Sequence, residues 1–253
     1  MKTLPVALQV YSIREEAEQD FAKAMQEVKK MGYDGVELAG LYGHSPEEIR
    51  DILSETGLIP ISAHVSYQEF QRDMQGTVHN YAVIGCKYVA IPNLPEKQRY
   101  GSEHFEEFMK NIPAISQACR EAGITLLYHN HDFEFRKTED GEYVLDYMYR
   151  IHGGEVLQVE LDTCWTKFAG EEPAAYMKKY AGRLPIVHLK DYSLEKGFEF
   201  RAVGKGILDF PAILEQAAAG SSEWVVVEQD GHPQYSAMED ARLSREYLSS
   251  QGW

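Results

Sequence analysis

The chain has 253 residues, of which 44% are hydrophobic, so it can bury a substantial core in one large domain or in two smaller ones. Its 40 acidic and 25 basic residues leave a formal net charge of −15, which repels phosphate backbones and argues against a nucleic-acid partner. No run reaches the ~18 apolar residues that a membrane-spanning helix needs, so we expect no membrane-embedded segment.

The three cysteines, Cys86, Cys119 and Cys164, are odd in number and widely spaced. This pattern argues against a disulfide framework and against a cysteine-based zinc site, and it indicates a reducing compartment. The first residues, from Met1 to Pro5, show no hydrophobic region of a signal peptide. We therefore expect a soluble protein of the cytoplasm.

Short apolar runs typical of β-strands recur along the chain, at residues 4–10, 35–38, 59–65, 87–91, 124–129, 156–161, 184–189 and 224–227. Charged stretches with helical spacing alternate with these runs, at residues 20–31, from 45 onward, 68–84, 102–121, 143–151, 173–180, 210–219 and 236–249. The stretch from Ser45 has a serine N-cap, a proline at the first helical position and acidic residues in the first turn.

Strands that alternate with helices indicate a parallel sheet, and eight such units indicate that the sheet closes into a barrel. No linker or change of composition divides the chain, so we predict one α/β domain, a (β/α)8 or TIM barrel, over residues 1–253. Two connections, 132–141 and 191–208, exceed the usual few residues. Both follow the C-terminal end of a strand, where barrel loops build active sites, and Gly204-Lys205-Gly206 is expected to shape the second one.

Polar side chains gather where the last four strands end. The ends carry His129 and His131, Glu160 and Asp162, His188, Lys190 and Asp191, and Glu228 and Asp230. In a barrel these ends are neighbours around the mouth, and together they offer histidine and carboxylate ligands that suit Mn, Mg, Fe, Co or Zn. Burying them together without a cation would cost several kcal/mol, so we predict a metal site there.

Weaker candidates come from other strand ends and loops. Glu37, His64 and Asn93 end or follow the second, third and fourth strands, and each either contacts substrate or closes a hydrogen bond inside the mouth. Trp165, just past Asp162, either walls the pocket or packs under a helix. Arg201, in the long seventh loop, is a further candidate for substrate contact.

Several of these motifs resemble the xylose isomerase-like barrel superfamily, often described as sugar phosphate isomerases/epimerases. The likeness spans essentially the whole chain and is carried by Tyr128-His129-Asn130-His131-Asp132-Phe133-Glu134-Phe135, Glu160-Leu161-Asp162-Thr163, His188-Leu189-Lys190-Asp191, Gly204-Lys205-Gly206 with Asp209-Phe210, and Val227-Glu228-Gln229-Asp230. The resemblance implies one bound divalent ion, with manganese as first choice and cobalt, magnesium, iron or zinc as alternatives. Carried over position by position, it implies the ligands His129, Asp162, His188 and Glu228.

One position departs from part of that family. Ketose 3-epimerases have a glutamate where this chain has His129, and two metal-bound glutamates move the proton there. This chain keeps only Glu228 of that pair, and it looks closer to inosose dehydratase at this position. The resemblance therefore leaves the reaction open between epimerisation and dehydration.

The chemistry shared by such relatives is proton abstraction next to a carbonyl, with a divalent ion stabilising the enediolate. We expect Glu228 or His131 as the base and Lys190 as an electrostatic partner or acid. Our first hypothesis is an isomerase or epimerase of a keto-sugar or related polyol. The second is a dehydratase or lyase acting on a keto-inositol or a 3-keto-glycoside.

Two further classes were weighed. A DNA-repair endonuclease of the same fold would need a three-zinc cluster and a basic face, and the net charge of −15 counts against it. A barrel that only binds a sugar is disfavoured by the carboxylates at the strand ends. The expected partner is thus a small sugar or polyol. The sequence allows a homo-oligomer but does not predict one, because a dimer interface on the barrel helices has the same pattern as any amphipathic helix face.

Overall fold

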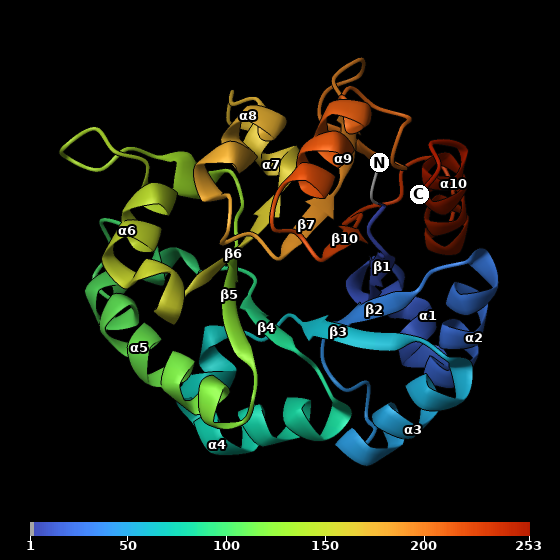
Figure 1. Ribbon diagram of the computed structural model, residues 1–253, viewed down its shortest axis with the longest axis horizontal. Coiled ribbons are helices and arrows are strands. Elements are labelled where there is room, and N and C mark those ends of the chain that lie inside the picture. The colour runs from blue at the N-terminus through green and yellow to red at the C-terminus, as the bar shows by residue number, and fades with distance from the viewer. Residues whose placement is uncertain (1–2) are drawn as a thin grey trace.

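The computed structural model describes residues 3–253, so Met1 and Lys2 of the predicted domain lie outside the described residues. Eight parallel strands form one sheet in the order β3-β2-β1-β10-β7-β6-β5-β4 (Figure 1). They are β1 (Val6–Gln9), β2 (Gly35–Leu38), β3 (Ile59–Ala63), β4 (Tyr88–Ile91), β5 (Thr125–His129), β6 (Gln158–Asp162), β7 (Ile186–Leu189) and β10 (Trp224–Val227). A parallel bridge between His64 and Ala90 joins β3 to β4 and nearly closes the barrel, which confirms the predicted TIM barrel.

Helices surround the sheet in Figure 1, as the alternating pattern predicts. They are α1 (Arg14–Gln19), α2 (Phe21–Met31), α3 (Pro46–Thr56), α4 (Tyr67–Ile84), α5 (Phe105–Glu121), α6 (Val144–Val156), α7 (Thr163–Phe168), α8 (Pro173–Met177), α9 (Phe210–Ala219) and α10 (Ala237–Ser250). Short 3-10 turns lie at Val10–Ile13, Glu96–Gln98, Phe133–Phe135 and Lys178–Tyr180. Helix α3 begins as expected, because Ser45 and Glu48 form a capping box.

Some elements differ from the prediction. The segment predicted to end before Gly153 continues to Val156, across a kink at Gly153, where φ is 60°. Helix α7 was not predicted, since its six residues directly follow β6 and are too few to show a helical period. The long seventh loop contains an antiparallel hairpin of β8 (Asp191–Ser193) and β9 (Glu199–Arg201), which was also not predicted.

Side chains that point into the barrel change from apolar to polar along the strands. The small interior cluster contains Ala7, Leu127, Ile186 and Val226, together with residues from β3 and β4. Two positions further along the same strands come Gln9, His129, His188 and Glu228. Because alternate residues of a strand share a face, the apolar floor and the polar mouth of the barrel come from the same inward-facing rows.

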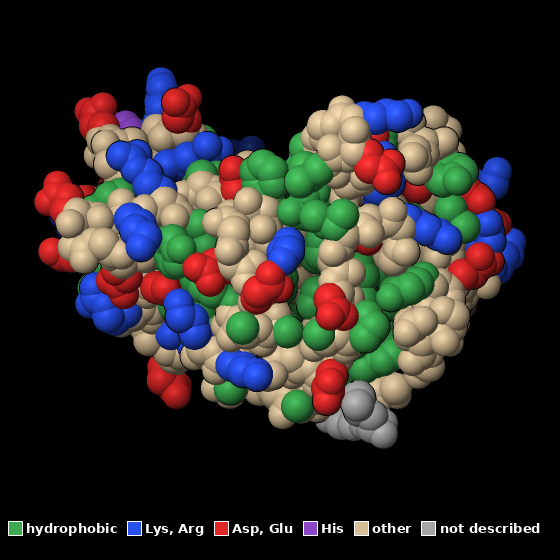
Figure 2. All heavy atoms as spheres, turned by 90° about the horizontal axis from the view of Figure 1, so that it is seen from above, with side chains coloured by type: hydrophobic (Ala, Val, Ile, Leu, Met, Phe, Trp, Pro, Cys, Tyr) green, Lys and Arg blue, Asp and Glu red, His purple; other side chains and the backbone are tan. Residues whose placement is uncertain are grey.

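The charged surface, the helices and the three cysteines match what the composition of the chain predicts. In Figure 2, acidic and basic side chains are intermixed over the visible face, with hydrophobic side chains between them. Within residues 3–253, no helix combines the length and apolar character required to cross a membrane. Cys86, Cys119 and Cys164 are all free and buried, as expected.

Candidate active site

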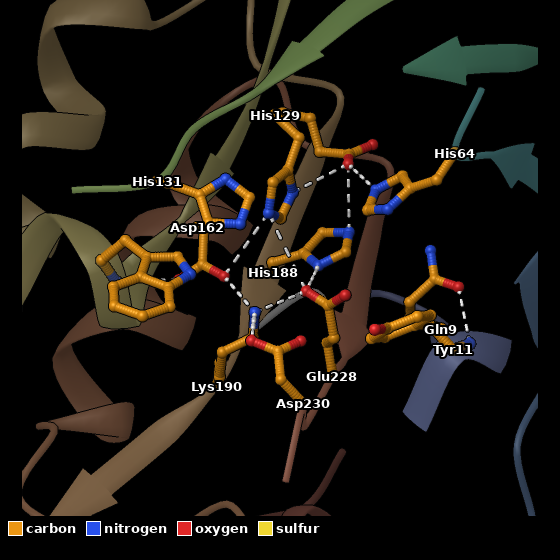
Figure 3. A network of polar contacts seen from close by, with 12 residues as sticks. Gln9, Tyr11, His64, His129, His131, Asp162, His188, Lys190, Glu228 and Asp230 are labelled. Atoms are coloured by element: carbon orange, nitrogen blue, oxygen red, sulfur yellow. Dashed lines mark hydrogen bonds and ion pairs between the residues drawn. The ribbon is translucent and has the colours of Figure 1, made fainter. Parts of the chain in front are cut away.

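Four side chains converge at the C-terminal mouth of the barrel (Figure 3). His129, Asp162 and His188 lie on β5, β6 and β7, and Glu228 follows β10 directly. Their potential ligand atoms all lie within 4.8 Å of one another, and all four residues are buried. His129 Nε2 lies 3.7 Å from Asp162 Oδ2 and 3.9 Å from Glu228 Oε2, and His188 Nδ1 lies 3.0 Å from Glu228 Oε2. The structure thus brings together the four side chains that the sequence indicated as metal ligands.

Lys190 reaches the same point from the end of β7. Its Nζ lies 2.8 Å from Glu228 Oε2, 3.1 Å from Asp162 Oδ2 and 3.0 Å from Asp230 Oδ2. Burial opposes the charge of the ammonium, but the carboxylates of Asp162, Asp230 and Glu228 outweigh it and raise the pKa of Lys190 well above its usual range. For the same reason, burial acts against ionised Glu228, but Lys190 and His188 hold the pKa of Glu228 well below its usual range. Glu228 and Lys190 are therefore a carboxylate and an ammonium in contact.

A second polar layer lies beneath these residues, deeper in the barrel. Glu160 Oε1 lies 2.7 Å from His64 Nε2, 3.1 Å from His129 Nδ1 and 3.2 Å from His188 Nε2. Glu37 Oε2 lies 2.7 Å from His188 Nε2. Both carboxylates are fully buried. The sequence assigns Glu160 no individual role, although its spacing of two from Asp162 places both side chains on the inward face of β6.

The donor set fits a divalent metal ion. Five carboxylates converge here, those of Glu37, Glu160, Asp162, Glu228 and Asp230, and the ammonium of Lys190 contacts the last three of them. Buried charges are costly unless they are compensated, so a further cation would stabilise this arrangement. Asp162 Oδ2 is buried and, apart from its ion pair with Lys190 Nζ at 3.1 Å, has no hydrogen-bond partner among the described residues. Imidazole nitrogen and carboxylate oxygen are borderline to hard ligands for such an ion.

A cavity of about 410 Å³ opens above the cluster. It is lined by Tyr11, Ala39, Gly40, His64, Ser66, Glu69, Pro92, Asn93, His129, His131, Glu228 and Asp230. Four residues predicted to contact substrate or to transfer a proton therefore face this cavity, namely His64, Asn93, His131 and Glu228. Glu37 does not, because it lies fully buried beneath His188 and accepts a hydrogen bond of 2.8 Å from Gln9 Nε2.

His131 is a neutral group on the cavity wall. Burial, together with the nearby charges of His129 and Lys190, lowers the pKa of His131 to about 2. Its Nδ1 has no hydrogen-bond partner among the described residues. Its ring packs against the rings of Phe133 and Trp165, with centroids 5.7 and 5.5 Å away. Trp165 therefore packs against a residue of the cavity wall and does not itself line this cavity.

The long seventh loop is held by a buried carboxylate. Asp191 Oδ2 accepts hydrogen bonds from the backbone N–H of Gly204 and Gly206, and Oδ1 accepts from those of Ile207 and Leu208, at 2.8–3.2 Å. A Cβ at position 206 would collide with Asp191 and with the backbone of Tyr192, which explains the glycine. The motif Gly204-Lys205-Gly206 thus shapes the loop, as expected.

In the structure, Arg201 does not take the position expected of a residue that contacts substrate. Its guanidinium donates hydrogen bonds to Glu199 and to the carbonyl oxygen of Phe200, at 2.6 and 2.9 Å, and the residue does not line the cavity described above. The sequence could not reveal this, because Arg201 and Glu199 are brought to the same side of a hairpin strand that was not predicted. Arg201 is a poor candidate for substrate contact.

Comparison with known proteins gives a consistent picture. A family model described as "Xylose isomerase-like TIM barrel" matches residues 25–251. An inosose dehydratase of Geobacillus kaustophilus is 21% identical over 266 residues, which cover 89% of this chain and 85% of that protein. A solved sugar phosphate isomerase/epimerase from Parabacteroides distasonis superposes with a TM-score of 0.84 at 20% identity, covering 99% of this chain and 95% of that one. The solved IOLI protein, which has a zinc atom bound, superposes with a TM-score of 0.72 at 17% identity, covering 98% of this chain and 97% of that one.

Proposed function

The chain belongs to the xylose isomerase-like TIM barrel family, an enzyme family, and from this premise we propose a specific reaction for it. The protein removes a proton next to the carbonyl of a keto-sugar or keto-polyol and then releases an oxygen substituent from the neighbouring carbon. It is thus a metal-dependent dehydratase or lyase, and keto-inositols and 3-keto-glycosides are the substrate classes of choice.

His129, Asp162, His188 and Glu228 would hold one divalent ion, with manganese as the first choice and zinc, cobalt, magnesium and iron as alternatives. When bound, such an ion supplies Lewis-acid polarisation of a carbonyl and makes the neighbouring C–H bond more acidic. The zinc bound in one related structure supports an ion at a mouth of this kind.

The chain's own residues would carry the proton transfers. Glu228 accepts the proton from the carbon next to the carbonyl, and the electron pair of that C–H bond forms a carbon–carbon double bond. The bond from the next carbon to its oxygen substituent breaks, and the oxygen leaves with the electron pair. Lys190 donates a proton to the departing oxygen, so that water or an alcohol is released. Glu228 then passes the proton that it accepted to Lys190, 2.8 Å away, and both groups return to their starting states.

The observation that carries the proposal is the direct contact of base and acid. Glu228 Oε2 and Lys190 Nζ lie 2.8 Å apart at one side of the mouth. A base and an acid in contact suit an elimination in which proton and leaving group depart on one face of the substrate. His129, at the position of the second glutamate of ketose 3-epimerases, has one nitrogen against Glu160 and the other toward Asp162 and Glu228. It therefore offers no free base, and the dehydratase names among the relatives support the same choice.

A second candidate is the isomerase or epimerase of our first hypothesis. His131 lines the same cavity, and its Nδ1 has no partner among the described residues. It is therefore available as a second proton-transfer group, which reprotonation at another face or carbon requires. The solved isomerase/epimerase structures support this candidate at the level of fold only.

One assay separates the two. Manganese-loaded protein is incubated in D2O with keto-sugars, keto-inositols and 3-keto-glycosides, and products are analysed by mass spectrometry and NMR. Loss of water or of the aglycone supports the elimination. Deuterium incorporation without loss of mass supports the second candidate instead. If no substrate of these classes exchanges or loses a group while the metal is bound, both candidates are wrong.

A further inference from the structure

We propose that the protein has a second small-molecule site beside the mouth of the barrel, which binds a carboxylate or phosphate group carried on a compact apolar body. The site is a cavity of about 350 Å³ between the connections 92–104 and 130–143, next to the first turns of the neighbouring helices α5 and α6 (Figure 1). This side cavity shares no lining residue with the cavity above the proposed metal ligands. Binding there needs neither the metal ion nor the proposed reaction.

Two arginines line the side cavity, and neither forms an ion pair with a carboxylate of residues 3–253. Arg136 is exposed, and its guanidinium makes no hydrogen bond with a described residue. Arg99 Nε donates a hydrogen bond of 2.8 Å to the carbonyl oxygen of Leu94, and its guanidinium carbon lies 3.7 Å from the ring centre of Phe133. These two contacts hold Arg99 in place but leave its terminal NH2 groups without a partner in the described part of the chain. In a protein with 40 acidic and 25 basic residues, two unpaired arginines at one cavity indicate that a ligand supplies the anion.

The chemistry of the two arginines selects an oxyanion. A guanidinium presents five N–H donors in a planar fork, which matches two oxygens of a carboxylate or of a phosphate. Arg99 comes from the connection after β4, and Arg136 comes from the connection after β5. Two positive groups at one cavity raise its electrostatic potential, so an oxyanion gains from both. We therefore expect the ligand to place its charged end between the two connections.

Two carboxyl groups also line the side cavity, but neither neutralises an arginine through an ion pair between described residues. Glu134 is buried and accepts hydrogen bonds from the hydroxyl of Tyr128 and from the backbone N–H of His131, one on each oxygen. Glu96 is exposed, and its charge opposes the binding of an anion at the same cavity. Removal of the Glu96 charge should therefore strengthen binding, whereas removal of an arginine should weaken it.

The rest of the lining suits an apolar body. Leu94, Phe105, Val144 and Met148 are each at most 3% exposed and form the inner part of the side cavity. Tyr100 packs edge-on against Phe105, with ring centroids 5.3 Å apart. A mainly apolar lining with a few placed polar groups is typical of small-molecule sites, whose volumes run from about 300 to 1,000 Å³. At about 350 Å³, the side cavity has room for a compact molecule, such as one with a single ring.

Phe133 lies between the side cavity and the mouth. Its ring lines the side cavity and stacks on His131, which lines the cavity at the mouth, with centroids 5.7 Å apart. Asn93 and Leu94 stand in the same relation, because these consecutive residues line the mouth cavity and the side cavity, respectively. A ligand in the side cavity is thus close to the proposed active site without contacting the proposed metal ligands.

Nitrogen-15 NMR titrations of the full-length protein, metal-free after chelation and dialysis, measure binding directly. The probes are benzoate and phenyl phosphate, and the comparisons are neutral benzamide and inorganic phosphate. We expect benzoate to bind at least about 10-fold more tightly than benzamide, because the amide lacks the charge-assisted hydrogen bonds. Phenyl phosphate should exceed inorganic phosphate by about the same factor, because only the phenyl ring uses the apolar lining. Both probes should shift the backbone signals of residues 94–102 and 133–136. A preference for either probe supports the proposal and identifies the oxyanion.

Three variants test the assignment of the charges. Arg136→Met should weaken the binding of both probes about 10-fold or more. Because Arg136 is exposed and unpaired among the described residues, this variant should melt at the same temperature as the unaltered protein. Glu96→Gln should strengthen binding about 2–5-fold. The matched control is Arg72→Met, which removes another exposed arginine, on α4, that does not line the side cavity. The control should bind both probes like the unaltered protein.

Equal affinity of Arg136→Met and Arg72→Met for the probes would overturn the proposal, because the anion would then bind elsewhere. Equal affinity of the unaltered protein for benzoate and benzamide would also overturn it, since the arginines would take no part. Binding that appears only in the manganese-loaded protein would place the anion on the metal instead. Failure of both probes to bind at their highest soluble concentration would leave no second site. None of these results would affect the proposed function, because the side cavity lies outside the mouth.

Discussion

Lys190 Nζ lies 2.8 Å from Glu228 Oε2 and 3.0 Å from Asp230 Oδ2, so a buried ammonium from the end of β7 joins two carboxylates that follow β10. This contact places a proton donor beside the residue that we propose as the base. It also offsets part of the negative charge of the mouth in the metal-free protein. Both roles can be separated by substitution.

Substitution of the lysine should affect catalysis more than metal content. In Lys190→Met the acid is lost, so we expect kcat for elimination to fall about 10²–10⁴-fold while one ion per chain is retained. The metal-free variant should also unfold at a lower temperature, because buried carboxylates lose their partner. Steady-state kinetics, elemental analysis and thermal melts check these points. The control Lys87→Met alters an exposed pair with Glu223 and should leave kcat unchanged. Loss of the metal in Lys190→Met would contradict the acid role.

Removal of the metal or of its ligands should lower stability. Manganese at about 100 times its Kd should stabilise the unaltered protein by about 2.7 kcal/mol, because only the folded state assembles the four ligands. His188→Ala and Glu228→Ala should each abolish stoichiometric binding and, with it, this stabilisation. Elemental analysis and melting temperature, each measured before and after chelation, test the expectation. Unchanged metal content in both variants would refute the assigned ligands.

The seventh loop should depend on Asp191. Asp191→Ala leaves the backbone N–H groups of Gly204, Gly206 and Leu208 without this acceptor, whereas that of Ile207 keeps the carbonyl oxygen of Tyr192. An unsatisfied buried donor costs about 1–3 kcal/mol, so we expect a comparable loss in the free energy of unfolding and faster proteolysis within 194–208. Urea unfolding and limited proteolysis measure both.

The matched control for the loop is Asp209→Ala, which removes the N-cap hydrogen bond of α9 to the backbone N–H of Ala212. It should cost about 1 kcal/mol and leave proteolysis of the loop unchanged. Equal effects of the two variants would show that Asp191 has no special role in the loop.

Glu134 should make stability depend on pH. Burial raises the pKa of this carboxyl group to about 7, although hydrogen bonds from Tyr128 and from the backbone of His131 act in the opposite direction. The folded state therefore holds the proton more tightly than the unfolded state, so the contribution of Glu134 to stability is full below about pH 4.5 and is lost as the pH rises through about 7.

Glu134→Gln lacks this titration but can still hydrogen-bond to Tyr128 and His131. Relative to the unaltered protein, the variant should gain on the order of 2–3 kcal/mol in unfolding free energy between pH 4.5 and pH 8. Urea unfolding at a series of pH values gives the difference directly. A difference that stays constant over this range would mean that Glu134 does not hold a proton in the folded state.

The local pattern was enough to predict the barrel and the members of its mouth. Strand and helix spacing depends on nearby residues, so the ranges 35–38, 210–219 and 224–227 match the structure at both ends. The four proposed ligands each end or follow a strand, and parallel strands end at the same edge. Their metal binding itself stays a prediction.

Only the tertiary structure decided what each polar residue does. Glu37 and Glu160 resemble mouth residues in the sequence, but the inward rows of the closed barrel place them beneath His188 and His129. Arg201 resembles a substrate contact, but an unpredicted hairpin pairs it with Glu199. Sequence spacing determines which face of a strand a side chain takes. Which side chains then meet depends on barrel closure, strand register and loop path, and these join residues far apart in the chain.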